Sequence, residues 1–208
     1  MQKRSHKLLA SALLESQQGF RAKRFELAFL FGSFQPDCNP LTYLKGFFRG
    51  QKLCGHNFSN SQFFIDKRIR RLQGRSRWHL WQYYTLGKLT HYLADAFTYP
   101  HNDHFPDGLM DHHRYETDLR LYLEDYLSRR TVRQEKVRQD VAGALQQLHR
   151  QYVSGAADMR KDVQFILKAT SLLMAGCLAG VGDGVPPKKG AAYLPDGEHI
   201  FLPAPTVA

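Results

Sequence analysis

The sequence contains few cysteines, no signal peptide is predicted in it, and it has no uninterrupted apolar run of membrane-spanning length. Its three cysteines, at positions 38, 54 and 177, form no CxxC pair, which favours a reduced, cytoplasmic protein over a disulfide-stabilised secreted one. The apolar stretch at residues 8–14 is short and precedes no small-x-small cleavage site. The most apolar late segment, 165–181, is interrupted by Lys168, Ser171 and glycines, so a buried core helix is expected there.

Composition indicates one globular domain with a basic surface. The chain has 208 residues, of which 43% are hydrophobic and 23% charged, and its formal net charge is +10. Such a charge favours anionic partners, such as nucleic acid, nucleotides or an anionic lipid surface, without choosing among them. A solvated basic surface with no dedicated partner is the alternative of equal weight.

Strand-like alternation is nearly absent, whereas helical spacing of apolar residues recurs along most of the chain. We therefore predict an all-α, single-domain, multi-helix fold over residues 1–180, followed by a Gly- and Pro-rich tail at 181–208. Helices are predicted at 4–16, 21–33, 59–72, 76–97, about 108–128, 131–152 and 157–179, with a short helix or turn at 41–50. The prolines of QPDCNP must end the second helix.

The middle of the chain concentrates side chains that bind zinc: His91, Asp95, His101, His112 and Glu116. Two pairs of them are four residues apart, a spacing that on a helix brings Cβ atoms within about 5–6 Å on one face. Burying the ionised Asp95 among apolar neighbours is costly without a cation. For the His91–Asp95 pair alone, a buried hydrogen bond is the simpler interpretation. The full set predicts a metal cluster between helices.

Asp37 and His56, which precede this part of the chain, are additional candidate ligands. Histidine and carboxylate ligands without paired cysteines suit zinc, with manganese or iron as alternatives. Mixed ligands of this kind leave coordination positions open, which is typical of a catalytic site. A carboxylate such as Asp95 can bridge two metals, and metals roughly 3.5–4 Å apart promote displacement at phosphorus. The constellation therefore predicts phosphoester hydrolysis.

The residues that carry this constellation resemble the zinc-dependent phospholipase C family. HYLADAFTYPH, residues 91–101, resembles the family signature, in which a His is followed four residues later by an Asp and then by a Pro and a second His. HHRYE resembles its His-x-x-x-Glu, while GSFQPDCNP and GHN are similar to its earlier Asp and His elements. The fungal single-strand-specific nucleases share this fold and trinuclear site. The resemblance spans roughly residues 1–125.

The resemblance implies a distribution of ligands among three metals. The first zinc would be held by Asp37, His56, His91 and Asp95. The second would be held by His101, His112 and Glu116, and the third by His6 with Asp95 as a bridge. Secreted family members also bind the third zinc through the amino group and carbonyl of an N-terminal Trp, where this chain has Met1. Two zinc ions are therefore expected, with a third bound more weakly, and Asp37 is expected to act as a base.

We predict a zinc-dependent phosphodiester hydrolase of phospholipase C type, acting on a phospholipid or nucleic-acid phosphoester, with peripheral membrane contact as a further expectation. A zinc-dependent nuclease or nucleotidase is the first alternative, and a non-catalytic metal-binding helical protein is the second. Arg114 and the basic run at 67–71 either meet substrate phosphate or form solvated helix faces. His104 and His113 are expected to support the ligands or to be exposed, whereas the remaining histidines, 79, 149 and 199, are expected to have ordinary roles.

Overall fold

The computed structural model describes residues 1–16, 20, 22–38, 58–102, 108–137, 139–156 and 158–181. Over these ranges the chain forms helices and no strand, which confirms the predicted all-α fold. In chain order the helices are α1 (Lys3–Ser16), α2 (Lys23–Phe34), the 3₁₀ helix η1 (Gln35–Cys38), α4 (Phe58–Gln73), α5 (Leu80–Ala96), the 3₁₀ helix η2 (Tyr99–His101), α6 (Leu109–Arg129), α7 (Val141–Val153) and α8 (Met159–Leu178). The predicted element at 41–50 and residues 182–208 of the predicted tail lie outside the described residues.

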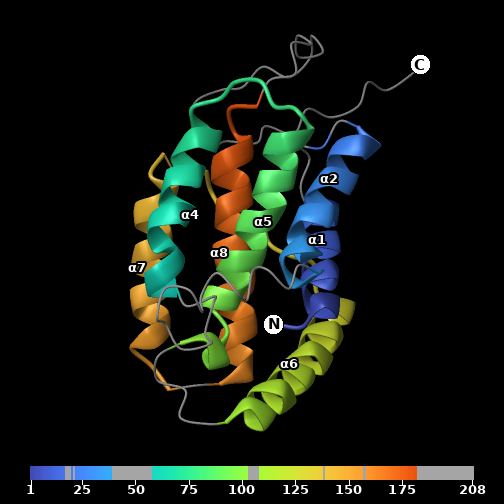
Figure 1. The fold of residues 1–208 in the computed structure, drawn as a ribbon, viewed down its shortest axis with the longest axis vertical. Coiled ribbons are helices and arrows are strands. Elements are labelled where there is room, and N and C mark those ends of the chain that lie inside the picture. The colour runs from blue at the N-terminus through green and yellow to red at the C-terminus, as the bar shows by residue number, and fades with distance from the viewer. Residues whose placement is uncertain are drawn as a thin grey trace, which may run out of the picture.

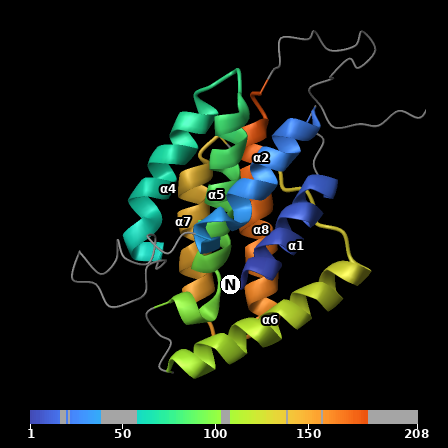
Figure 2. The same ribbon diagram turned by 45° about the vertical axis from the view of Figure 1, so that its right-hand side comes forward.

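Helices α5 and α8 form the centre of the bundle, with α4 and α7 on one side and α1 and α2 on the other (Figure 1). Helix α5 contacts α1, α2, α4 and α8, so it is buried nearly all round over its C-terminal half. A helix surrounded in this way is apolar on every face, except where function requires polar groups. Helix α6 runs obliquely across one end of the bundle and contacts α1, α8 and η2 (Figure 2). The N-terminus and the C-terminal end of α5 lie at that same end.

Two glycines bring α2 and α5 into backbone contact. A Cβ added at Gly32 would clash with the carbonyl oxygen of Tyr84, and one added at Gly87 would clash with the carbonyl oxygen of Phe29. Glycine is needed at both positions because any side chain would separate the helices. The contact places the end of α2, and the η1 turn that follows it, beside the C-terminal half of α5.

The helix predicted at 131–152 begins ten residues later than expected, at Val141. The side chain of Asp140 accepts a hydrogen bond from the backbone nitrogen of Gly143, at 2.9 Å, which caps the helix at that point. Upstream, the backbone carbonyl of Arg133 accepts a hydrogen bond from Ser171 Oγ instead of from a helical amide. The predicted start at 131 is therefore wrong, because a tertiary contact and a local cap override the amphipathic pattern.

The apolar segment near the end of the described chain is α8, a core helix, as predicted. Most of its residues from Ile166 to Cys177 are buried against the rest of the bundle. Over the described ranges, no helix combines the length and the apolarity that crossing a membrane requires.

Candidate metal centre

Seven of the eight predicted metal ligands converge where α1, η1, the end of α5, η2 and α6 meet. They are His6, Asp37, His91, Asp95, His101, His112 and Glu116. His56, the eighth, lies outside the described residues. The side chains divide into a deeply buried group on α1 and α5 and a partly buried group on η2 and α6.

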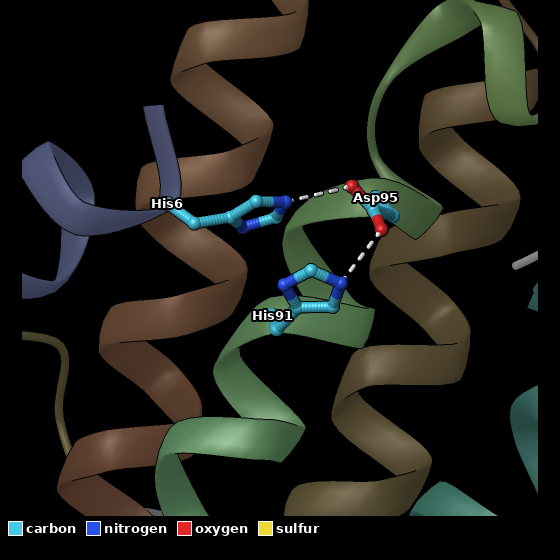
Figure 3. A group of neighbouring side chains, drawn as sticks. All are labelled: His6, His91 and Asp95. Atoms are coloured by element: carbon cyan, nitrogen blue, oxygen red, sulfur yellow. Dashed lines mark ion pairs between the residues drawn. The ribbon is translucent and has the colours of Figure 1, made fainter. Parts of the chain in front are cut away.

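The first group consists of His6, His91 and Asp95, each almost fully buried (Figure 3). Nε2 of His6 lies 3.2 Å from Asp95 Oδ1, and Nε2 of His91 lies 3.3 Å from Asp95 Oδ2. The two imidazole rings stack, with their centroids 3.8 Å apart. Two histidines from different helices therefore address the two oxygens of one carboxylate, and the four-residue spacing on α5 places His91 and Asp95 on one face.

Asp37 adds a second carboxylate to this group from the η1 turn. Its Oδ1 lies 3.5 Å from Nε2 of His91, and its Oδ2 lies 4.0 Å from Nε2 of His6. The Asp37 side chain is 15% exposed, whereas that of Asp95 is 3% exposed. The side chain of Asp37 is thus the more exposed of the two acidic side chains in this group.

The orientation of His91 depends on Ser33, a residue that the sequence did not single out. Nδ1 of His91 lies 2.9 Å from the backbone carbonyl oxygen of Ser33. A carbonyl can only accept, so this contact assigns the proton to Nδ1 and directs the lone pair of Nε2 toward the carboxylates. Metal-binding histidines are commonly oriented in this way. The role belongs to the backbone, so no side-chain signal in the sequence could reveal it.

The second group consists of His101, His112 and Glu116. Nε2 of His101 and Nε2 of His112 each lie 3.1 Å from Glu116 Oε1. His112 and Glu116 are one turn apart on α6, and His101 comes from η2. Side-chain exposure is 13% for His101 and Glu116 and 28% for His112. This group is therefore more accessible than the group of His6, His91 and Asp95.

The α-amino group of Met1 lies between the two groups. Its nitrogen is 2.7 Å from Asp95 Oδ1, 2.9 Å from Glu116 Oε1 and 3.0 Å from Nε2 of His101. Burial lowers the pKa of this amino group, but the Asp95 and Glu116 carboxylates outweigh that effect and raise the pKa to about 10. In the sequence, Met1 is notable only as a difference from the family's Trp, whereas in the structure its amino group lies in the centre.

Neighbouring charges and hydrogen bonds favour the ionised forms of Asp95 and Glu116. Burial alone would raise the pKa of Asp95, but the Met1 ammonium and His6 hold it well below its usual value. Burial likewise opposes ionisation of Glu116, yet hydrogen bonds from His101 and His112 lower its pKa. Burial and the Met1 ammonium both lower the pKa of His101. Ionised carboxylates and a neutral imidazole are the protonation states in which such side chains bind metal.

The surroundings of His6 indicate whether a metal ion fits the first group. The residue is 1% exposed, and neither of its ring nitrogens forms a hydrogen bond within the described part of the chain. Buried polar atoms normally form hydrogen bonds. Nε2 of His6 forms none but faces the Asp95 carboxylate, as it would if a metal ion lay between them. In each group the ligand atoms lie within 4.8 Å of one another. This set of nitrogen and oxygen donors suits zinc, so both groups fit the predicted metal.

The other candidate residues that the structure describes belong to neither group. His113 and Arg114 are exposed on α6. The basic run at 67–71 is a solvated helix face with Ile69 turned into the core, as the simpler interpretation proposed. His149 is partly buried beside Asn102, and His104 and His199 lie outside the described residues.

Comparison with known proteins identifies a family. A family model described as zinc dependent phospholipase C matches residues 5–160 of the chain, a range that includes every predicted ligand from His6 to Glu116. No curated protein and no solved structure matches the chain.

Proposed function

Because the chain belongs to the zinc-dependent phospholipase C family, we propose that it hydrolyses the phosphodiester bond of a phospholipid at the two ligand groups. The observation that carries this proposal is the position of Asp95. Its carboxylate is 3% exposed, faces His6 with one oxygen and His91 with the other, and contacts the Met1 amino group that reaches Glu116. A carboxylate shared in this way is suited to bridging metals.

Each of the two groups would hold zinc. His6, His91 and Asp95, with Asp37 beside them, would hold zinc in the buried group, and His101, His112 and Glu116 would hold zinc in the accessible group. Zinc bound at such sites lowers the pKa of water toward neutrality and polarises a phosphoryl oxygen. The Ser33 carbonyl keeps Nε2 of His91 available as a ligand.

Asp37 is the residue that we assign as base. It is the more exposed carboxylate of the buried group and lies within 4.0 Å of His6 and His91. From this position its carboxylate would orient the attacking water and accept the water's proton. Asp95 and Glu116 are engaged by several cationic or hydrogen-bonding groups, and their lowered pKa values make them poor proton acceptors.

Nucleic acid is the rival substrate, because the formal net charge of +10 favours a polyanion. The exposed basic face of α4 around Arg68 and Arg70 is consistent with either substrate. The two readings use the same metal chemistry and differ only in the groups attached to phosphorus. A direct comparison of substrates therefore decides between them.

The test combines metal analysis of the purified chain with a substrate panel: a short-chain phosphatidylcholine, a dinucleotide and a chromogenic phosphodiester. We expect bound zinc, and faster cleavage of the lipid than of the dinucleotide. Asp37→Asn should lower the turnover number by about 10²–10⁴-fold, whereas the exposed Asp118→Asn should leave it unchanged. A preference for the dinucleotide would support the nuclease. Zinc-loaded protein that cleaves none of the three substrates would overturn the enzymatic proposal.

A further inference from the structure

A buried carboxylate outside both ligand groups contacts the elements that carry the second one. Asp162, in the first turn of α8, is 0% exposed. Its Oδ2 accepts hydrogen bonds from the backbone nitrogen of Tyr99 at 2.9 Å and from the hydroxyl of Tyr115 at 3.0 Å. Its Oδ1 accepts one from the hydroxyl of Tyr152 at 2.7 Å. Asp162 also lies beyond the range that the family model matches, which ends at residue 160.

The donors to Oδ2 connect Asp162 to two parts of the metal centre. Tyr99 opens η2, the turn that ends at His101. Tyr115 directly precedes Glu116 on α6. One carboxylate oxygen therefore ties the turn that carries His101 to the helix that carries Glu116, and these two ligands lie 3.1 Å apart.

The cost of burying Asp162 indicates that its role is more than packing. An ionised carboxylate removed from water destabilises a protein unless hydrogen bonds compensate it. Here three donors converge on it, two of them tyrosine hydroxyls that would otherwise need other partners. Because η2 is only a short turn, with few backbone hydrogen bonds of its own, a fixed external acceptor is an effective way to set its position.

We propose that Asp162 is a positioning residue for the second ligand group, holding η2 against α6 so that His101 and Glu116 face one metal ion. The proposal rests on the proposed function only in requiring that this group binds zinc. The first group draws its ligands from α1 and α5 and is oriented by Ser33. Loss of Asp162 should therefore weaken zinc binding at the second group and leave the first group largely unchanged.

Two tyrosines offer a matched pair of variants. Tyr115→Phe and Tyr152→Phe each remove one hydroxyl that donates to Asp162. Tyr115 stands on α6 beside Glu116, whereas Tyr152 stands on α7, which carries none of the predicted ligands. A merely structural role for the buried cluster predicts similar effects of the two substitutions. A positioning role predicts that only Tyr115→Phe affects metal binding.

The measurement is a zinc titration of the full chain against a competing chelator, which resolves tight and weak ions, together with absorption spectra of the cobalt-substituted protein. Asp162→Ala and Tyr115→Phe should weaken one of the bound ions by about 10- to 100-fold and alter the cobalt spectrum. Tyr152→Phe should leave both affinities and the spectrum as in the wild type. Asp162→Asn should restore most of the affinity lost in Asp162→Ala, because its amide oxygen can still accept from Tyr99 and Tyr115.

The outcomes separate this inference from the proposed function. If wild-type protein binds no zinc, both fail. If the wild type binds zinc at two sites and Asp162→Ala binds it equally tightly, only the positioning role is wrong. Equal weakening by Tyr115→Phe and Tyr152→Phe would also refute the positioning role. Should Asp162→Ala fail to fold, the two tyrosine variants decide the question by themselves.

Discussion

Replacing Gly87 with alanine should damage both the fold and the first ligand group. Gly87 lies where α5 touches the backbone of α2, and an added Cβ would clash with the Phe29 carbonyl oxygen and lie 2.9 Å from the Ser33 nitrogen. Ordinary contacts of a Cβ begin near 3.4 Å, and the clash with the Phe29 carbonyl oxygen is the tighter of the two, so the helices must separate by roughly 1 Å. Backbone atoms cannot move aside as a flexible side chain does.

The size of the effect follows from three contributions to the free energy of unfolding. Overpacking of a tight interface costs about 1–3 kcal/mol. Separation of the helices also strains the contact between His91 Nδ1 and the Ser33 carbonyl, now 2.9 Å, worth about 1 kcal/mol. Alanine recovers about 1 kcal/mol through its higher helix propensity. The net loss is about 1–3 kcal/mol, which lowers the midpoint temperature by roughly 3–10 °C for a chain of this size.

Thermal unfolding followed by circular dichroism, in parallel with zinc content, measures both consequences. The control is Gly180→Ala, because a Cβ at Gly180 would meet nothing within 4 Å. The control should unfold at the wild-type temperature and bind the same amount of zinc. A Gly87→Ala protein that unfolds at or above the wild-type temperature, with its zinc content intact, would show that the α2–α5 contact does not set the site.

Three further predictions concern Asp95, Asp162 and the bound metal. Asp95→Asn keeps the shape of the side chain but removes an anionic ligand, so elemental analysis should find less bound zinc than in the parent protein. The control His79→Ala, at the start of α5, should bind as much zinc as the parent. Equal zinc content in Asp95→Asn and the parent would contradict the bridging role. Burial raises the pKa of Asp162 from 3.8 to about 6, so the folded state holds this proton more tightly than the unfolded chain does. The stabilisation is present in acid and is lost as the pH rises from about 4 to 7, by roughly 3 kcal/mol. With a chelator present, the unfolding free energy of the wild type should fall by that amount relative to Asp162→Asn over this pH range. A difference in unfolding free energy between the two proteins that does not change with pH would refute this prediction. A chelator should abolish phosphodiester cleavage and zinc should restore it, whereas chelator-resistant turnover would exclude the metal mechanism.

The helices and most of the ligand groups were predictable from local patterns. Apart from the start of α7, apolar spacing located the described helices to within a few residues, because most of them bury one face. The pairs His91–Asp95 and His112–Glu116 were predictable because one helical turn fixes the separation of their side chains. Helical spacing alone could not place His6 beside His91 and Asp95, since that depends on how α1 packs against α5. The family resemblance implied only that His6 and Asp95 hold one metal together.

Features that rest on tertiary contacts were beyond the sequence. Ser33 acts through its backbone carbonyl, so its residue type carries no signal. Asp162 resembles an ordinary acidic residue in the first turn of a helix, where negative charge is common. The start of α7 depends on the cap formed by Asp140 and on the hydrogen bond that Ser171 donates to the backbone carbonyl of Arg133. In each case the deciding partner lies outside the periodic pattern that local reasoning follows.

The two ligand groups have separate supports but are connected through one carboxylate and the Met1 amino group. The first group depends on the glycine contact between α2 and α5, and we infer that the second depends on Asp162. Asp95 joins them, because its Oδ1 contacts both His6 and the Met1 amino group, which in turn contacts Glu116. Damage to one support should therefore impair one group first, whereas loss of the Asp95 charge acts on both. We therefore expect Asp95 to be the least replaceable residue of the centre, even though each group contains two histidines of its own.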